Sequence, residues 1–171
     1  MLTQDQMKQH AELGIPSEYS ARRLPFYTEA TELVDVGKNI VGRMQRLTPA
    51  AASRWQQMVE AAAEDGLALL IVSGYRSFEY QAGLIQKKLA AGQSIDEILT
   101  VNAAPGYSEH HSGRAVDIAI AGSPPLTEIF ETSAAFTWLT QSAGQFGFKM
   151  SYPRDNPAGF IYEPWHWALG E

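Results

Sequence analysis

Residues 67–77 read LALLIVSGYRS, and this stretch decides the fold. Its first six residues, Leu67–Val72, are all apolar, and a run this short predicts a buried strand because a helix would need more residues. Ser77 stands where a helix cap is expected, and the pattern behind it predicts a helix to about Ala90. The polar residues Ser73–Ser77 are therefore expected at the end of a strand, where a helix begins.

Predicted helices and strands flank this stretch on both sides. The clearest helix begins with Thr48 as its N-cap and Pro49 at its first helical position, and it ends near Gly66. Residues 15–47 before it have a mixed pattern. Further helices are expected at 3–13, Ile95–Val101 and Ser133–Gly147, and extended segments at Glu32–Val36, Ala115–Ile120, Phe148–Tyr152 and near Phe160–Trp167. Helices separated from a small sheet indicate an α+β domain, with the strand order left open.

Size and charge narrow the classes of protein. A chain of 171 residues with 45% hydrophobic content is close to one domain and can bury a core without cross-links. The net charge is −6 and no run of lysine or arginine stands out, which disfavours nucleic-acid binding.

Targeting signals are not visible in the sequence. Residues 1–20 lack the apolar stretch of a signal peptide, and no segment has the roughly 18 apolar residues of a membrane span. As the sequence stands, we expect a cytoplasmic protein, with the periplasm or cell envelope as the alternative for a processed form.

The chain has no cysteine, so a metal site would have to use histidine, aspartate and glutamate. It has four histidines. His10 lies in a polar segment and is expected at the surface. The other three fall in two compact segments, 108–117 (SEHHSGRAVD) and 163–167 (EPWHW).

The first segment starts in a loop and ends inside an apolar strand. Asp117 stands among apolar neighbours, and a carboxylate buried there is costly unless a cation or a hydrogen bond meets it. His110 lies seven residues before Asp117, and a turn at Gly113 would let both side chains reach one point. A metal site and a buried Asp–His hydrogen bond both fit this segment.

The second segment supplies Glu163 and His166, the latter between two tryptophans. One interpretation is that the two tryptophans close the hydrophobic core and that His166 is hydrogen-bonded inside it. The other follows from the two segments together, because a hydrolytic zinc needs three protein ligands, an open position for water, and a carboxylate that takes the proton of the water. Counting does not decide which carboxylate is the ligand and which is the base.

Arg76 lies in the polar turn after the predicted strand Leu67–Val72. An arginine near a metal can stabilise the oxyanion of a tetrahedral intermediate, or it can bind a substrate carboxylate through two hydrogen bonds. A surface ion pair with Glu79 or another acid is the alternative for this residue.

Three motifs together resemble the VanY-type zinc D-alanyl-D-alanine carboxypeptidases: SGYRS at 73–77, SEHHSGRAVD at 108–117 and EPWH at 163–166. This group also holds D-Ala-D-Ala dipeptidases and the lysostaphin-like and hedgehog-type domains. The family pattern is Ser-x-His-x-x-Gly-x-Ala-x-Asp followed by Glu-x-x-His, and every fixed position is filled here.

The resemblance implies a role for each motif residue. The implied zinc ligands, one ion per chain, are His110, Asp117 and His166. Glu163 would be the general base and Arg76 would stabilise the transition state. Substrate contacts are implied for Ser108, Tyr75 and Gln81, and His111 would be exposed or behind the ligands, not a fourth ligand.

The resemblance also implies a substrate and a fold. The substrate would be a peptidoglycan stem peptide or precursor, which loses its C-terminal D-alanine. The fold would be an α+β domain with a small central antiparallel sheet over 25–171, preceded by an N-terminal extension, 1–24.

Other functions remain open for these residues. An Fe(II) oxygenase also uses two histidines and a carboxylate, but its usual His-x-Asp spacing differs and it has no need of Glu163. A peptidoglycan endopeptidase or L,D-carboxypeptidase on the same scaffold would share the catalytic residues. A non-catalytic domain with a structural metal would need neither Glu163 nor Arg76.

Overall fold

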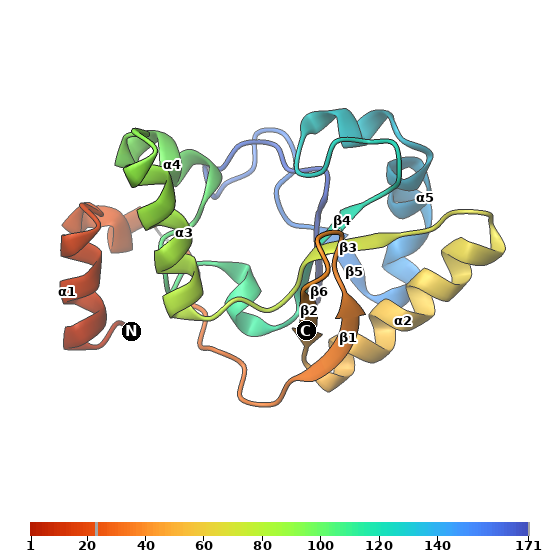
Figure 1. Ribbon diagram of the computed structural model, residues 1–171, viewed down its shortest axis with the longest axis horizontal. Helices are drawn as coiled ribbons and strands as arrows, with labels where there is room; N and C mark the ends of the chain where they lie inside the picture. The colour runs from red at the N-terminus through yellow and green to blue at the C-terminus, as the bar shows by residue number, and fades with distance from the viewer. Residues whose placement is uncertain (23, 171) are drawn as a thin grey trace.

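A four-stranded antiparallel sheet forms the centre of the fold (Figure 1). The computed structural model describes residues 1–22 and 24–170. The strands lie in the order β3 (Leu70–Ser73), β4 (Ala115–Ala119), β6 (His166–Leu169) and β5 (Phe148–Met150), and each neighbouring pair is antiparallel. The expected α+β class with a central antiparallel sheet is confirmed.

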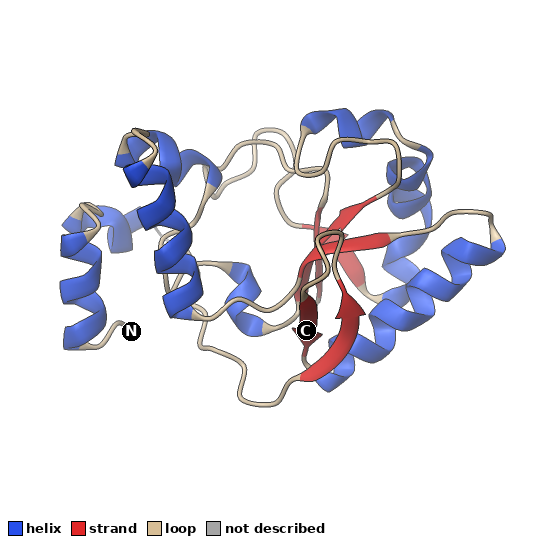
Figure 2. Ribbon diagram, viewed as in Figure 1, coloured by secondary structure: helices blue, strands red, loops and turns tan. Residues whose placement is uncertain are grey.

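The first hydrophobic core lies between this sheet and two helices, α2 (Pro49–Glu64) and α5 (Ala134–Ser142), at the right in Figure 2. Thr48 caps α2 as expected, because its side chain accepts a hydrogen bond from the Ala51 N–H. Strand β4 is buried along its whole length. Members of this core include Leu47, Trp55, Met58, Val116, Ile118, Phe130 and Leu139.

A second hydrophobic core lies away from the sheet, among α1 (Gln4–Glu12), α3 (Phe78–Ala90) and α4 (Ile95–Val101) at the left in Figure 2. Helices α3 and α4 have the expected bounds because Ser77 and Ser94 cap them with their side chains. Its members include Leu13, Ile15, Ile85, Ile98, Leu99 and Tyr107. The molecule therefore has two packed regions, and the turn after β3 leads from the first to the second.

A two-stranded hairpin, β1 (Val34–Lys38) and β2 (Met44–Leu47), falls within 15–47, where the sequence analysis did not expect a pair of strands. Most of its side chains are exposed or half-buried, so it lacks the apolar alternation that predicts a strand. The side-chain oxygen of Asn39 accepts two backbone N–H groups of the connecting turn. The hairpin also supports the turn after β3, because the Tyr75 N–H donates to a carbonyl of β2.

The prediction of an extended segment near Phe160–Trp167 is wrong for most of these residues, because β6 begins only at His166. The chain before it makes a turn, in which the Trp167 indole N–H donates to the Pro164 carbonyl at 2.9 Å. This turn places Glu163 close to His166 in space.

The longest described helix is α2, with 16 residues. Within the described part of the chain, no helix combines the length and the apolar character that crossing a membrane requires.

Candidate active site

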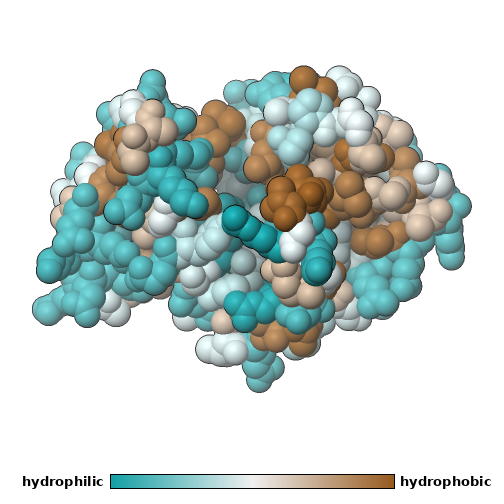
Figure 3. Space-filling model, in the orientation of Figure 1, coloured by the Kyte–Doolittle hydropathy of each residue, from teal (hydrophilic) through white to brown (hydrophobic). Residues whose placement is uncertain are grey.

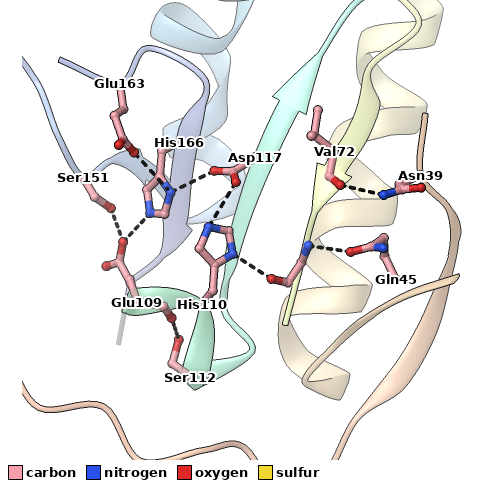
Figure 4. Close-up of polar contacts among 11 residues, drawn as sticks. Asn39, Gln45, Val72, Glu109, His110, Ser112, Asp117, Ser151, Glu163 and His166 are labelled. Carbon is pink, nitrogen blue, oxygen red and sulfur yellow. Dashed lines mark hydrogen bonds and ion pairs between the residues drawn. The ribbon is translucent and has the colours of Figure 1, made fainter. Parts of the chain in front are cut away.

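Two strands and a short helix bring the three expected metal ligands together (Figure 4). Asp117 on β4 and His166 on β6 are direct partners in the sheet register. His110 comes from a short 3-10 helix, Glu109–Ser112, and Gly113 after it has a φ of 65°, so the chain turns into β4 as expected. The possible ligand atoms lie within 4.8 Å of one another, and all three residues are buried.

Asp117 lies between the two histidines. Its Oδ2 is 3.2 Å from His110 Nε2, and its Oδ1 is 2.9 Å from His166 Nδ1. The first contact is close but lacks hydrogen-bond geometry, so His110 Nε2 is buried without a hydrogen-bond partner among the described residues. Leaving such an atom unpartnered is costly, and a cation bound between the three side chains would remove that cost.

In each histidine, the ring nitrogen that does not face Asp117 contacts another group of the protein. Nδ1 of His110 lies 2.7 Å from the Gly74 carbonyl oxygen, and Nε2 of His166 lies 2.8 Å from Glu109 Oε2. The Ser151 hydroxyl donates to the same Glu109 oxygen at 2.6 Å. Contacts of this kind fix the ring orientation and direct the remaining nitrogen toward a metal. Two oriented imidazoles and a carboxylate are a donor set that fits zinc.

The buried carboxylates and histidines of the centre shift one another's pKa values. Burial alone would lower the pKa of His166, but the Asp117 and Glu109 carboxylates raise it to about 10. Burial lowers the pKa of His110 to about 4, and Arg76 adds to the fall. Burial favours neutral Asp117, but its contacts with both histidines hold its pKa well below the usual range. A bound cation would take the place of the His166 proton.

Glu163 is buried beside the three candidate ligand residues without belonging to their group. Its Oε2 lies 3.9 Å from His166 Nδ1 (Figure 4). Burial raises the pKa of the Glu163 carboxyl to about 7, although His166 opposes this rise. A carboxyl with a pKa near neutrality can both accept and return a proton at that pH, as a general base that later acts as an acid must do.

A cleft of about 220 Å³ opens over the centre, and the face in Figure 3 is hollowed between the helices at the left and the rest of the molecule. Arg76 lines this cleft, and its Nε is buried without a hydrogen-bond partner in the described part of the chain. The alternative ion pair of Arg76 with Glu79 is not found among the described residues, and Glu79 accepts a hydrogen bond from Gln9 at 3.0 Å. Arg76 is therefore available to a ligand in the cleft.

The three expected substrate contacts lie in two places. Ser108 and Gln81 are buried and line the cleft, and the Gln81 amide donates to the Ala103 carbonyl at 2.8 Å. Tyr75 is not among the cleft-lining residues. It lies over a neighbouring depression against the hairpin, with the Arg46 guanidinium 5.7 Å from its ring centre.

Two further histidines are buried for structural reasons. His10 was expected at the surface, but it is 8% exposed, and its Nε2 lies 2.8 Å from the Pro105 carbonyl because α1 packs on the second core. His111 is fully buried behind the ligands, where its Nδ1 contacts the Arg76 carbonyl oxygen at 2.7 Å and its Nε2 accepts the Gly106 N–H. It is outside the ligand group, and it holds the backbone of Arg76.

Three residues of this region were not predicted from the sequence: Glu109, Ser151 and Lys88. Glu109 lies inside the SEHHSGRAVD motif, and its position next to His110 was the available signal. Ser151 follows β5, and it reaches the centre only because β5 pairs with β6. Lys88 lines the cleft from α3, which no local pattern relates to the ligands.

Comparisons with known proteins identify the family of this chain. The family model described as VanY, D-alanyl-D-alanine carboxypeptidase, matches residues 44–169. A D-alanyl-D-alanine carboxypeptidase of Enterococcus faecium is 30% identical over 174 residues, which cover 96% of this chain and 52% of the relative. The chain spans about half the length of the curated relatives it matches.

Solved structures show the same relationship. The LdcB LD-carboxypeptidase superposes with a TM-score of 0.73 at 30% identity, covering 85% of this chain and 71% of LdcB. A mutant of the vancomycin-resistance D,D-pentapeptidase VanY, in complex with Zn(II), gives a TM-score of 0.64 at 29% identity and covers 82% of this chain and 79% of its own. Sequence, fold and motif residues thus lead to one assignment. The chain belongs to the VanY family of D-alanyl-D-alanine carboxypeptidases.

Proposed function

We propose that this protein is a zinc metallopeptidase that removes the C-terminal D-alanine from peptidoglycan stem peptides or their precursors. The observation that carries the proposal is the convergence of His110, Asp117 and His166 beside a buried Glu163 that is outside their group. A structural metal site would need no such extra carboxylate. The proposal assigns the peptidase domain to 25–171 and an N-terminal extension to 1–24.

His110, Asp117 and His166 would hold one zinc ion. When bound, zinc lowers the pKa of its water to about 7 and polarises the carbonyl of the peptide bond. The hydrogen bonds of Gly74 and Glu109 to the two histidines keep both rings oriented for this ligand set.

Glu163 is the general base of the proposed reaction. It takes a proton from the attacking water and later passes it to the amine that leaves with the released D-alanine. The wall beside it is partly apolar, since the buried Trp165 lines the cleft. Exclusion of water strengthens each electrostatic interaction in the cleft.

Arg76 is proposed to stabilise the oxyanion that forms on the scissile carbonyl. Its buried Nε lacks a protein partner among the described residues, so a substrate oxygen can occupy that position. Ser108 and Gln81 contact the bound peptide from the cleft wall, and Tyr75 contacts it from the adjoining depression.

A second candidate is an L,D-carboxypeptidase, which removes the single D-alanine of a tetrapeptide. The similarity to the LdcB LD-carboxypeptidase, with a TM-score of 0.73 at 30% identity, supports this candidate. The catalytic residues would be unchanged, and only the residue before the scissile bond would differ.

Release of free D-alanine tests both candidates. The zinc-loaded protein is incubated with a pentapeptide ending in D-Ala-D-Ala and, separately, with the matching tetrapeptide, and D-alanine is measured by mass spectrometry. Release from the pentapeptide that stops with a chelator supports the first candidate, and release from the tetrapeptide alone supports the second. Glu163→Ala should keep zinc and lose nearly all turnover, so full activity in this variant would contradict the role of Glu163.

A further inference from the structure

Lys88 faces the cleft from the last turn of α3. It is half-buried and lines the cleft together with Arg76 and Glu163, whereas Lys87 beside it is exposed and is absent from the cleft wall. The mechanism described above makes no use of Lys88. Its position nevertheless brings an ammonium group to the same space that would receive the substrate.

The polar partner of this ammonium group is neutral. Lys88 Nζ donates to the side-chain oxygen of Asn102, and the ion pairs found among the described residues include neither Lys88 nor Arg76. The two cations line one cleft, and Arg76 disfavours the charge of Lys88. Burial and Arg76 lower the pKa of Lys88, with Glu163 acting in the opposite direction.

Glu109, Asp117 and Glu163 also line this cleft, but neither cation forms an ion pair with them, so an anion from outside the protein can pair with Lys88 and Arg76. A carboxylate that entered the cleft would gain charge-assisted hydrogen bonds, which are stronger than bonds between neutral groups. Asn102 would keep the ammonium oriented toward the cleft in the absence of such a ligand.

We propose that Lys88 is the receptor for a carboxylate of the bound peptide, a subsite separate from the metal ligands and from Arg76. This inference rests on the proposed function, because it assumes that a peptide binds in this cleft. The carboxylate has two sources in a stem peptide: the free C-terminus, and the α-carboxylate of the γ-linked D-glutamate within it.

Binding measurements separate these sources without relying on turnover. The zinc-loaded Glu163→Gln protein is titrated by calorimetry with the pentapeptide L-Ala-γ-D-Glu-L-Lys-D-Ala-D-Ala. Two further peptides carry an amide at the C-terminus or at the D-glutamate α-carboxylate. The same titrations are made with Glu163→Gln proteins that also carry Lys88→Met, Lys88→Arg or, as the matched control, Lys87→Met.

Lys88→Met should weaken binding of the parent pentapeptide about 10- to 100-fold, as expected for loss of one charge-assisted hydrogen bond. Amidation of the recognised carboxylate should cause a similar loss in the protein that retains Lys88, and no additional loss in Lys88→Met. The amide that behaves in this way identifies the source. Lys88→Arg should retain most of the affinity, and Lys87→Met should retain all of it.

Unchanged binding by Lys88→Met would overturn the proposal. The proposal would also be overturned if Lys88→Met weakened binding of each amidated peptide as much as it weakens binding of the parent pentapeptide. Lys88 would then act on the peptide independently of either carboxylate. Binding that depends on Lys88, together with no D-alanine release by the parent enzyme, would support the subsite and reject the proposed function. Absence of any peptide binding would reject both.

Discussion

Replacement of Glu109 tests how the protein prepares His166 for a metal. Glu109 Oε2 lies 2.8 Å from His166 Nε2, and its side chain is 16% exposed, so solvent screens this contact weakly. A hydrogen bond to a charged group contributes about 1.5–3 kcal/mol, which corresponds to roughly 10- to 150-fold in a binding constant. Loss of an outer partner of a metal ligand typically lowers metal affinity about 10- to 100-fold.

A second effect of this substitution opposes the first. Glu109 also helps to raise the pKa of His166 to about 10, so its removal weakens the competition between the proton and the metal. We therefore expect the lower end of the range, with the zinc Kd rising about tenfold in Glu109→Ala and less in Glu109→Gln, which can still accept the bond. Fewer protons should be released when zinc binds to Glu109→Ala.

Zinc affinity is measured by competition with a chromophoric chelator, and proton release by calorimetry in two buffers of different ionisation enthalpy. Glu79→Gln is the matched control, because Glu79 is an exposed glutamate on α3 that bonds only Gln9 among the described residues. Unchanged zinc affinity and unchanged proton release in Glu109→Ala would refute the reasoning. A similar change in Glu79→Gln would assign the effect to net charge instead.

Four other substitutions test three separate parts of the structure. Gly74→Ala would place a Cβ 2.7 Å from the Arg46 carbonyl oxygen, so we expect a loss of about 1–3 kcal/mol in urea unfolding. In Gly83→Ala, on α3, the added Cβ has no atom within 4 Å, so the free energy of unfolding should rise by about 0.4–1 kcal/mol. Equal effects of the two glycine substitutions would contradict this account. Burial lowers the pKa of His10 below its ordinary 6.5, so its stabilising contribution is present above pH 6.5 and is lost as the pH falls. The difference in unfolding free energy between the parent and His10→Gln should therefore shrink from pH 8 to pH 5, and a constant difference would contradict it. Arg76→Ala should lower kcat about 100-fold or more with zinc content unchanged, whereas a change in KM alone would favour substrate binding over oxyanion stabilisation.

The helices with local start signals were predictable from the sequence. Thr48 with Pro49, Ser77, and Ser94 each mark a helix start by chemistry within a few residues, and the structure begins a helix after each. The hairpin was not predictable in this way, because its side chains are largely solvent-facing and it is held by the turn around Asn39. Its exposure removes the periodic signal that a buried strand would give.

The site was predictable where the residues themselves are rare and costly to bury. Rare histidines and an aspartate in apolar surroundings marked His110, Asp117 and His166 as candidates, the family resemblance implied that they are ligands, and the structure brings them together. Ser151 depends on the pairing of β5 with β6, and no local pattern contains the strand order. The prediction that His10 lies at the surface was wrong. Its neighbours in the sequence are polar and give no sign that α1 packs against the distant loop that contains Pro105.

The place of β6 in the sheet has a consequence for folding. β6 is the last described strand along the chain, yet it lies between β4 and β5. Until β6 is inserted, β4 has an open edge with unpaired backbone groups and apolar side chains, which other chains could pair with and aggregate. Asp117 also lacks its neighbour His166 at that stage, so the ligand set is completed only when this last strand docks. Metal captured at that moment would hold β6 against β4, and zinc supplied during refolding should therefore raise the yield of native protein more than zinc added afterwards.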